Sequence, residues 1–159
     1  MDPDVSPPPT IRVANKALII RDRHLLVTVN DGPASTFYLC PGGGQERGED
    51  AHQGLRRECR EEIGCDVEVG DLAFLRDYIG DDHEFADHDG GHHQREAYFF
   101  CTLLPGTEPQ FDGEGDQWQT GITWIPLDGL EDQPLWPKAL APWLALPVDA
   151  RPGYLGNVN

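Results

Sequence analysis

The sequence lacks any hydrophobic run long enough to cross a lipid bilayer. Its longest apolar stretches, residues 16–20 and 97–101, are far shorter than the roughly 20 residues that a membrane-spanning helix needs. The first ten residues contain acids and prolines, where a secretory signal would have a basic patch followed by an apolar stretch. These absences argue against a membrane partner and lead us to expect a cytoplasmic protein.

Basic residues are also scarce. The chain has 12 Lys and Arg against 28 Asp and Glu, which gives a formal net charge of -16 at pH 7. Binding to a nucleic-acid duplex depends on Lys and Arg contacts to phosphates, so this balance argues against such a partner. An acidic site can hold a phosphorylated ligand only if cations lie between the two. We therefore expect divalent metal ions in any phosphate-handling site of this protein.

Cysteine is the third scarce feature. The four cysteines, Cys40, Cys59, Cys65 and Cys101, are scattered along the chain and form no Cys-x-x-Cys pair. Such spacing does not predict a disulfide framework. We expect four reduced thiols that are buried as small hydrophobic side chains.

The length of 159 residues and the hydrophobic content of 38% predict one globular domain with a single core. We assign residues 11–148 to this domain. Residues 1–10 are expected to form a disordered Pro-rich tail, and residues 149–159 a C-terminal tail. The sequence leaves a monomer and a homodimer both open.

The clearest predicted element is a helix over residues 50–63. Asp50 can cap its first turn, and Gly64 can end it. Leu55 and Cys59 lie four residues apart, so they share one apolar stripe of this helix.

The other predicted elements surround this helix. Residues 41–44, Pro-Gly-Gly-Gly, are expected to form a loop, and residues 136–146 a final helix. This order of strands, helix, further strands and terminal helix predicts an α+β fold with a mixed sheet covered by helices. The strands are expected at residues 12–20, 25–29, 37–40, 67–69, 72–79, 96–103 and 121–125.

Three carboxylates converge on one side of the predicted helix. At 100° per residue, Glu58, Glu61 and Glu62 fall within roughly a 100° arc. Their mutual repulsion costs the helix about 0.2–0.5 kcal/mol per pair unless a cation neutralises it. Mg²⁺ prefers oxygen ligands and keeps several waters, which leaves places for phosphate oxygens and an attacking water.

The alternative is that residues 56–62, Arg-Arg-Glu-Cys-Arg-Glu-Glu, are only a solvated helix face with mixed charges. The spacing to the preceding loop argues against this alternative. Reading from Gly43, the pattern is Gly, five residues, Glu49, seven residues, Arg57-Glu58, an apolar position, one residue, Glu61-Glu62, one residue, Gly64 and an apolar position. Its seven fixed positions would coincide by chance below once in ~10⁵ such chains.

Residues 43–65 resemble the Nudix box without a mismatch, although both aliphatic positions are cysteines, Cys59 and Cys65. The resemblance is looser outside this box. It includes the predicted leading hairpin, the Pro-Gly-Gly entry and the segment Trp124-Ile-Pro-Leu-Asp-Gly-Leu130. It implies the Nudix fold, a mixed sheet sandwiched between helices, in which the box forms a loop-helix-loop metal site.

The resemblance also implies roles for individual residues. Glu58, Glu61 and Glu62 take the metal-binding and catalytic positions. The backbone carbonyl of Gly42 or Gly43 completes the metal shell, where glycine allows the chain to approach an ion closely.

Arg57 and Glu49 match the family's pair that ties the helix to its loop and orients the metal ligands. The plain alternative for this pair is a surface salt bridge. Family members usually add an acidic residue from outside the box, as a further ligand or as the base. Glu114 is the favoured candidate, Glu96 and Asp116 are the alternatives, and each of them is otherwise a solvated carboxylate.

The acidic, His-rich segment 80–93 is long enough to be functional. A transition-metal site, a substrate lid and a plain solvated loop all remain open for it, although its histidine spacing matches no known ligand motif. Four aromatic side chains can either stack on a nucleotide base or pack in the core. They are Phe37, Tyr38, Phe85 and Trp118.

The resemblance implies a Mg²⁺-dependent hydrolase, in which Mn²⁺ can substitute. Its expected substrate is a nucleoside diphosphate linked to another moiety, such as an oxidised nucleoside triphosphate, ADP-ribose or a dinucleoside polyphosphate. The reaction is attack of water at phosphorus. The rival interpretations are a non-catalytic Nudix-fold nucleotide-binding module and a Nudix-fold isomerase, for which no acid/base pair can be assigned.

Overall fold

The computed structural model describes residues 9–159. Its elements follow in chain order. They are β1 (Arg12–Arg21), β2 (His24–Asp31), β3 (Thr36–Leu39), β4 (Gly42–Gly44), α1 (Ala51–Ile63), β5 (Val67–Ile79), η1 (Gly80–Asp82), α2 (Ala86–Asp89), β6 (His93–Leu103), β7 (Gln119–Pro126), η2 (Leu130–Asp132), β8 (Leu135–Trp136), α3 (Leu140–Ala145), η3 (Val148–Ala150) and β9 (Tyr154–Asn157). The expected tail at residues 1–8 lies outside the described residues.

The strands form one curled mixed sheet in the order β8-β3-β2-β1-β6-β5-β9, with β4 paired to β1 and β7 paired to β2. The pairs β1/β6, β5/β9 and β3/β8 are parallel, and the others are antiparallel. The β1–β2 hairpin joins two arms of the sheet, because these strands pair only next to their turn. The predicted α+β class with a mixed sheet is confirmed.

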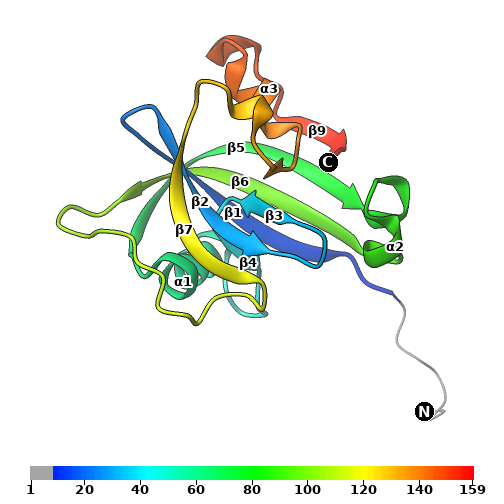
Figure 1. Ribbon diagram of the computed structural model, residues 1–159, viewed down its shortest axis with the longest axis horizontal. Coiled ribbons are helices and arrows are strands. Elements are labelled where there is room, and N and C mark those ends of the chain that lie inside the picture. The colour runs from blue at the N-terminus through cyan, green and yellow to red at the C-terminus, as the bar shows by residue number, and fades with distance from the viewer. Residues whose placement is uncertain (1–8) are drawn as a thin grey trace.

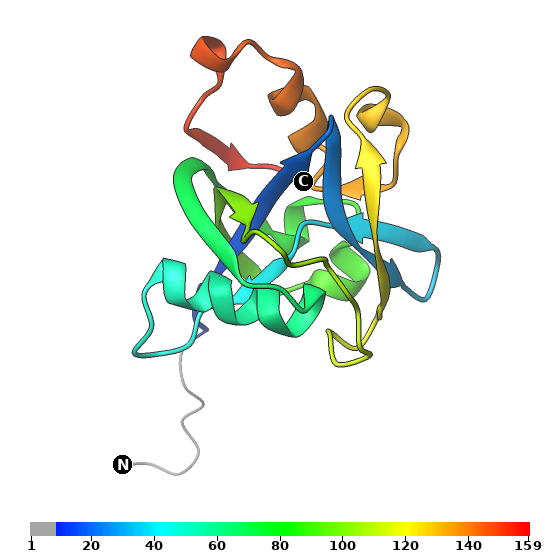
Figure 2. The ribbon, with the colours of Figure 1, turned by 90° about the vertical axis from the view of Figure 1, so that its left-hand side faces the viewer.

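Helices α1 and α3 lie on opposite sides of the sheet (Figures 1 and 2). Side chains of Leu55, Cys59 and Ile63 bury one stripe of α1 against β1, β2 and β6. Trp143 of α3 packs on the other face, where its ring centroid lies 4.8 Å from that of Phe74. The expected sandwich of a sheet between helices is therefore confirmed.

Helix α1 begins and ends where the sequence predicts. Asp50 accepts a hydrogen bond from the Gln53 backbone amide, and the Gln53 side chain accepts one from the Asp50 amide, which together form a capping box. Gly64 ends the helix in the left-handed conformation. All four cysteines are free and buried, as expected.

The expectation of a loop at residues 41–44 was wrong, because Gly42–Gly44 forms β4 along β1. Gly42 has a φ of 136°, and a Cβ there would lie 2.1 Å from the Asn15 carbonyl oxygen. Three glycines have little local preference for a strand, so pairing with β1 determines this conformation.

The C-terminal part of the chain also differs from expectation. The predicted helix over residues 136–146 is reduced to Leu140–Ala145, because residue 136 lies in β8 and pairs with β3. Residues 149–159 were expected to be a tail, but Tyr154–Asn157 forms β9 beside β5. The predicted strands at 67–69 and 72–79 are one strand, β5, with a register shift between Val69 and Leu72. Within residues 9–159, no helix is both long enough and apolar enough to span a membrane.

Candidate active site

The candidate site lies where α1 passes β4. The apolar stripe of α1 faces the sheet, which turns the neighbouring side chains of Glu58 and Glu62 toward the glycines of β4. Helix α1 and β4 are consecutive in the chain and are linked by residues 45–50. The site is therefore built from strand β4, the loop of residues 45–50 and helix α1, and both β4 and α1 contact β1.

Arg57 ties this loop to the helix. Its Nη2 donates to Glu49 Oε1 at 2.7 Å and to the Gly44 carbonyl at 3.0 Å, and its Nε donates to Glu49 Oε2 at 3.2 Å. Glu49 Oε1 also accepts a hydrogen bond from the Glu46 amide. The hydrogen bonds from Arg57 hold the pKa of Glu49 below its usual value. The structure thus joins Glu49 and Arg57 in a bidentate salt bridge, which is stronger and more directional than an ion pair with a single hydrogen bond.

Glu62 is the most deeply buried carboxylate of the helix, with 6% of its surface exposed. Its Oε2 accepts a hydrogen bond from the Gly42 amide at 3.0 Å. Burial raises the pKa of Glu62 to about 7, while the Lys16 charge and the Gly42 hydrogen bond oppose this rise. A carboxylate that is buried with so little compensation is stabilised in its charged form by an additional cation.

Glu58 lies one helical turn before Glu62 and faces Gly43. A Cβ at Gly43 would lie 2.7 Å from Glu58 Cδ, so a larger residue here would displace this carboxylate. Burial raises the pKa of Glu58, the hydrogen bond from Arg57 lowers it, and the charge of Glu61 raises it again. Glu61 itself lies at the rim, with a half-exposed side chain whose Oε1 is 3.4 Å from Arg57 Nη1. Glu58 and Glu62 therefore converge on the glycines, and Glu61 borders them.

The donor set fits a hard divalent cation. Glu58, Glu62 and the carbonyls of Gly42 and Gly43 offer only oxygen, which is the ligand type that Mg²⁺ prefers. Within residues 9–159, no three His, Cys, Asp or Glu side chains already form a closed metal cluster. Mg²⁺ does not need one, because it is commonly held by one or two carboxylates together with waters and substrate phosphates.

The three acids considered outside the box lie in different surroundings. The charge of Asp116 reaches both Glu58 and Glu62 and raises their pKa values. Glu114 and Asp116 are both exposed, and the backbone amide of Glu114 donates to Asp112. The influence on Glu58 and Glu62 makes Asp116 a candidate beside Glu114, which the sequence favoured.

Glu96 belongs to a buried ion pair in the core. Its Oε1 accepts hydrogen bonds from Arg76 Nε at 2.5 Å and from the Tyr98 hydroxyl at 3.0 Å, and its Oε2 accepts one from Gln94. Arg76 opposes the effect of burial and holds the pKa of Glu96 below its usual value. Both oxygens of Glu96 are therefore already occupied by side chains of β5 and β6.

Two residues beside the carboxylates were missed by the sequence analysis. Lys16 is 8% exposed, and its Nζ lies 3.4 Å from the Gly42 carbonyl oxygen. Gln119 donates from Nε2 to the Glu62 backbone carbonyl at 2.8 Å. Its Oε1 is buried without a hydrogen-bond partner among the described residues. The one available signal was a lysine in a strand, residues 14–20, whose other residues apart from Asn15 are apolar.

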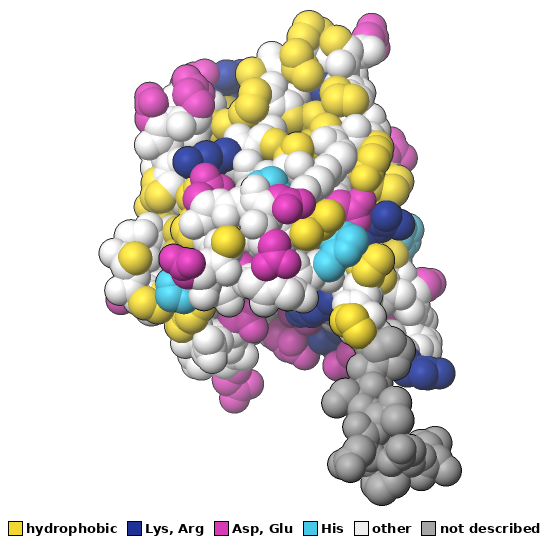
Figure 3. Space-filling model, turned by 90° about the vertical axis from the view of Figure 1, so that its right-hand side faces the viewer, with side chains coloured by type: hydrophobic (Ala, Val, Ile, Leu, Met, Phe, Trp, Pro, Cys, Tyr) yellow, Lys and Arg dark blue, Asp and Glu magenta, His cyan; other side chains and the backbone are white. Residues whose placement is uncertain are grey.

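Segment 80–93 folds into two short helical turns, η1 and α2, rather than a loop. His83 Nε2 lies 2.7 Å from Asn157 Oδ1, and the Tyr78 hydroxyl donates to Asp89 at 2.6 Å. Acidic side chains are dispersed over the face of the molecule that carries α2 (Figure 3). No metal-holding group of three or more side chains occurs in this segment, all of which is described.

The four aromatic residues considered for base stacking form two edge-to-face contacts and one core contact. Trp118, 42% exposed, lies over Phe37 with ring centroids 6.4 Å apart, in the segment that carries Asp116. Phe85 packs on Trp136 at 4.8 Å. Tyr38 packs against the core between the two arms of the sheet. Trp118 is thus an exposed aromatic side chain at the edge of β3, two residues after Asp116.

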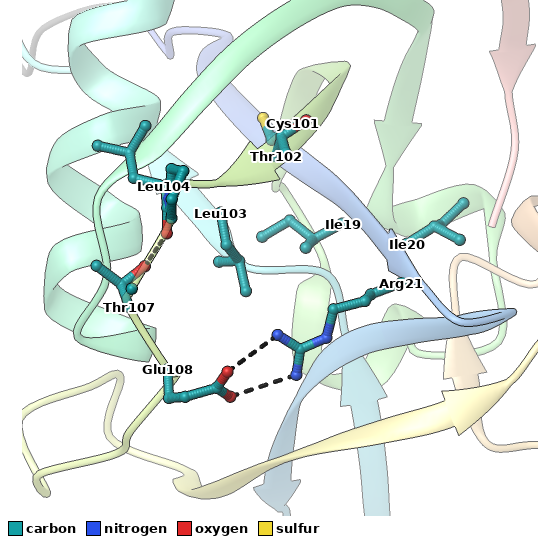
Figure 4. Close-up of a pocket in the computed structure, with 11 residues that line it drawn as sticks. Ile19, Ile20, Arg21, Cys101, Thr102, Leu103, Leu104, Thr107 and Glu108 are labelled. Atoms are coloured by element: carbon teal, nitrogen blue, oxygen red, sulfur yellow. Dashed lines mark hydrogen bonds and ion pairs between the residues drawn. The ribbon is translucent and has the colours of Figure 1, made fainter.

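A separate hollow of about 220 Å³ lies at the far end of β1 (Figure 4). Apolar side chains of β1 and β6 line it on one side, and Arg21 and Glu108 close the other through hydrogen bonds of 3.2 and 3.3 Å. It shares no lining residue with the box. The hollow is therefore distinct from the candidate site.

One known protein family and several solved structures match this chain. The family model of the NUDIX domain matches residues 10–146. A search of curated proteins finds no match. The structure is similar to a MutT NUDIX hydrolase from Burkholderia pseudomallei, with a TM-score of 0.66, 24% identity, and coverage of 83% of this chain and 95% of that one.

Two further solved structures share this fold. An ADP-ribose pyrophosphatase from Streptococcus suis has a TM-score of 0.62 and 22% identity, with 94% of this chain and 100% of that one covered. A UDP-X diphosphatase has a TM-score of 0.65 and 21% identity, with 97% of this chain and 70% of that one covered. The family match spans most of the chain and includes the loop-helix site described above, so this protein belongs to the NUDIX family and is a Nudix hydrolase.

Proposed function

We propose that this protein hydrolyses a phosphoanhydride bond in a nucleoside diphosphate linked to another moiety, in a reaction that depends on Mg²⁺. The observation that carries this proposal is the convergence of Glu58 and Glu62 on Gly42 and Gly43. These two carboxylates and a glycine carbonyl would hold the metal, with Glu61 at the rim. When bound, Mg²⁺ neutralises phosphate charge and lowers the pKa of the attacking water.

Other residues of the site hold the metal-binding carboxylates in place and accept the proton of the attacking water. Arg57 and Glu49 hold the box loop against α1, so that the carboxylates keep their direction without rearrangement. Asp116 lies close enough to influence Glu58 and Glu62, and we assign it the role of the acid outside the box that accepts the proton of the water. Glu114 remains the alternative for that role.

Similar solved structures and one exposed aromatic side chain support a substrate class. The solved structures with this fold include proteins named as an ADP-ribose pyrophosphatase and a UDP-X diphosphatase, which supports a nucleotide-linked diphosphate. The exposed ring of Trp118, which follows the Asp116 segment, can stack on a base or a sugar. We place ADP-ribose and nucleotide sugars first, and nucleoside triphosphates and dinucleoside polyphosphates second.

The rival function is a binding module that recognises a nucleotide without cutting it. Such a module has no need for charged ligands that repel one another beside a glycine turn. Here Glu58, Glu61 and Glu62 are all present, and burial raises the pKa of two of them. This costly arrangement favours catalysis over simple binding.

The deciding experiment is a hydrolysis screen followed by ³¹P NMR. ADP-ribose, UDP-glucose, oxidised and normal nucleoside triphosphates, and diadenosine polyphosphates are incubated with protein and Mg²⁺, with Mn²⁺, and with excess chelator. We expect turnover of at least one compound with either metal and none with chelator. Full activity in chelator, or tight binding with no cleavage of any compound, would contradict the proposal.

A further inference from the structure

Lys16 is a buried cation at the candidate site that none of the expected roles includes. It lies in β1 directly opposite Gly42, where β1 and β4 pair. With 8% of its surface exposed, its ammonium reaches the Gly42 carbonyl oxygen at 3.4 Å. The amide of the same glycine donates to Glu62, so the Gly42 residue connects Lys16 to the metal-binding carboxylates.

The hydrogen bonding of this ammonium is incomplete. An ammonium has three N–H donors, and the structure gives Lys16 one acceptor at the long limit of a hydrogen bond. No carboxylate lies within 4.0 Å of it among residues 9–159. Burying a charge without full pairing is costly, so the observed contacts do not account for a lysine at this position.

The neighbouring acids have direct hydrogen-bond partners other than Lys16. Glu96 is already paired with Arg76 at 2.5 Å. Glu62 is held by the Gly42 amide and faces the proposed metal. The charge of Lys16 favours ionised Glu62 and Glu96 from a distance, without a direct ion pair to either one. The free donors of Lys16 are therefore available to an anionic ligand.

We propose that Lys16 binds a phosphate oxygen of the diphosphate substrate through the donors that remain free beside Gly42. This inference rests on the proposed function, because a diphosphate held over Gly42 and Gly43 by the carboxylate-bound metal would bring its oxygens to this ammonium. A carbonyl oxygen has two lone pairs, so the bond from Lys16 leaves Gly42 able to face a metal as well. The phosphate then lies between two cations and screens their repulsion.

The alternative is that Lys16 only balances the charge of buried acids. These two roles differ in what a neutral side chain would change. Loss of a phosphate contact weakens diphosphate binding and leaves metal binding intact. Loss of a balancing charge changes the metal affinity or the stability of the ligand-free protein, and leaves the diphosphate contact unaffected.

The test uses methylenediphosphonate, a diphosphate analogue in which a CH₂ group replaces the bridging oxygen and prevents hydrolysis. Its affinity is measured by calorimetry in Mg²⁺ for the full chain and for Lys16→Met, Lys16→Arg and Lys138→Met. Lys138, the only other lysine, is exposed and lies 3.7 Å from Glu84. Mn²⁺ binding without diphosphonate is followed by electron paramagnetic resonance, and thermal melting checks folding.

We expect Lys16→Met to weaken diphosphonate binding by at least about tenfold, which is the usual effect of losing a hydrogen bond to a charged group. Lys16→Arg should retain binding to within about threefold, because the guanidinium also donates to phosphate. Lys138→Met and the Mn²⁺ affinity of Lys16→Met should match the unchanged protein. If Lys16→Met fails to fold, Lys16→Gln replaces it in the same measurements.

Two results would overturn the inference while the proposed function stands. One is unchanged diphosphonate affinity in Lys16→Met, and the other is an altered Mn²⁺ affinity with no separate loss of diphosphonate binding. In both cases the unchanged protein still hydrolyses a compound of the screen. If that protein neither binds diphosphonate nor hydrolyses any compound, the proposed function fails and the inference fails with it.

Discussion

Gly42 contacts two functional side chains of the candidate site through its backbone. Its amide donates to Glu62, its carbonyl accepts from Lys16, and its φ of 136° lies where L side chains are rare. A Cβ would meet the Asn15 carbonyl oxygen at 2.1 Å. Glycine at this position therefore allows β4 to pair closely with β1, while the amide and the carbonyl of Gly42 both face the site.

The two converging carboxylates give the first residue-level prediction. Glu58→Gln and Glu62→Gln keep the side-chain shape and remove the charge that would hold the metal. Each should lower the hydrolysis rate by at least about 10²-fold, or ~2.7 kcal/mol of barrier. Folding should survive, because relief of carboxylate repulsion favours the helix. Steady-state rates and circular dichroism melting provide the measurements.

Glu68→Gln is the matched control for these changes, because Glu68 is an exposed glutamate of β5 outside the box. It should leave the rate within about twofold, as expected for a surface substitution with little effect on the fold. Normal turnover of folded Glu58→Gln and Glu62→Gln proteins on the true substrate would show that the box has only a structural role.

At the scale of elements, the segment between β6 and β7 is anchored on α1. Gln119, the first residue of β7, donates to the backbone carbonyl of Glu62 and so anchors the end of this segment on α1. A Cβ at Gly115 would collide with Gln119 Oε1, so the segment packs closely over this amide. The anchoring explains how the charge of Asp116, three residues earlier, reaches Glu58 and Glu62.

Substitution of the two acids in this segment separates their roles. Asp116→Asn should lower the rate by at least about tenfold, because proton transfer by a positioned group contributes about 10²–10⁴-fold. Glu114→Gln should leave the rate within about twofold, since its charge is not among those that raise the pKa values of Glu58 and Glu62. Rates measured across pH 6 to 9 for both variants test this assignment. The reverse ranking would return the role to Glu114.

At the scale of the whole molecule, the C-terminal strand closes one edge of the sheet. The Tyr154 hydroxyl of β9 donates to Asp77 Oδ2 at 2.6 Å, and Arg95 and His93 of β6 contact the same carboxylate. The side chain of Asn157 accepts hydrogen bonds from the Ile79 amide and contacts the segment after β5. The end of the chain therefore joins the sheet to the acidic segment 80–93.

Asp77 makes this closure dependent on pH. The Tyr154 hydrogen bond, followed by those from Arg95 and His93, holds the pKa of Asp77 below its usual value. The stabilisation is therefore present above the unfolded pKa of about 3.9, and it is lost as pH falls through the lower folded value. Asp77→Asn should reduce the free energy of unfolding at pH 7 by about 1.5–3 kcal/mol, the range for hydrogen bonds to charged groups.

Urea unfolding at pH 7 and at pH 3 measures this effect. The difference between Asp77→Asn and the unchanged protein should shrink at pH 3. Asp71→Asn, an exposed position on the same strand, should show little difference at either pH. A loss of stability from Asp77→Asn that is equal at both pH values would contradict the electrostatic account.

The sequence by itself determined the parts of this protein that depend on local physics. The capping residue Asp50, the apolar spacing of Leu55 and Cys59, and the terminating Gly64 all act within a few residues, so α1 was predictable to its ends. The box motif likewise predicted the family, and helix periodicity predicted that Glu58, Glu61 and Glu62 converge. In the structure Glu58 and Glu62 face the glycines, while Glu61 stays at the rim.

Only the tertiary structure decided the features that depend on partners far along the chain. The glycines of β4 became a strand through β1, and Tyr154–Asn157 became a strand through β5. The same holds for the place of Lys16 beside Gly42. Long-range pairing sets which side chains meet across the sheet, and no local periodicity encodes that register.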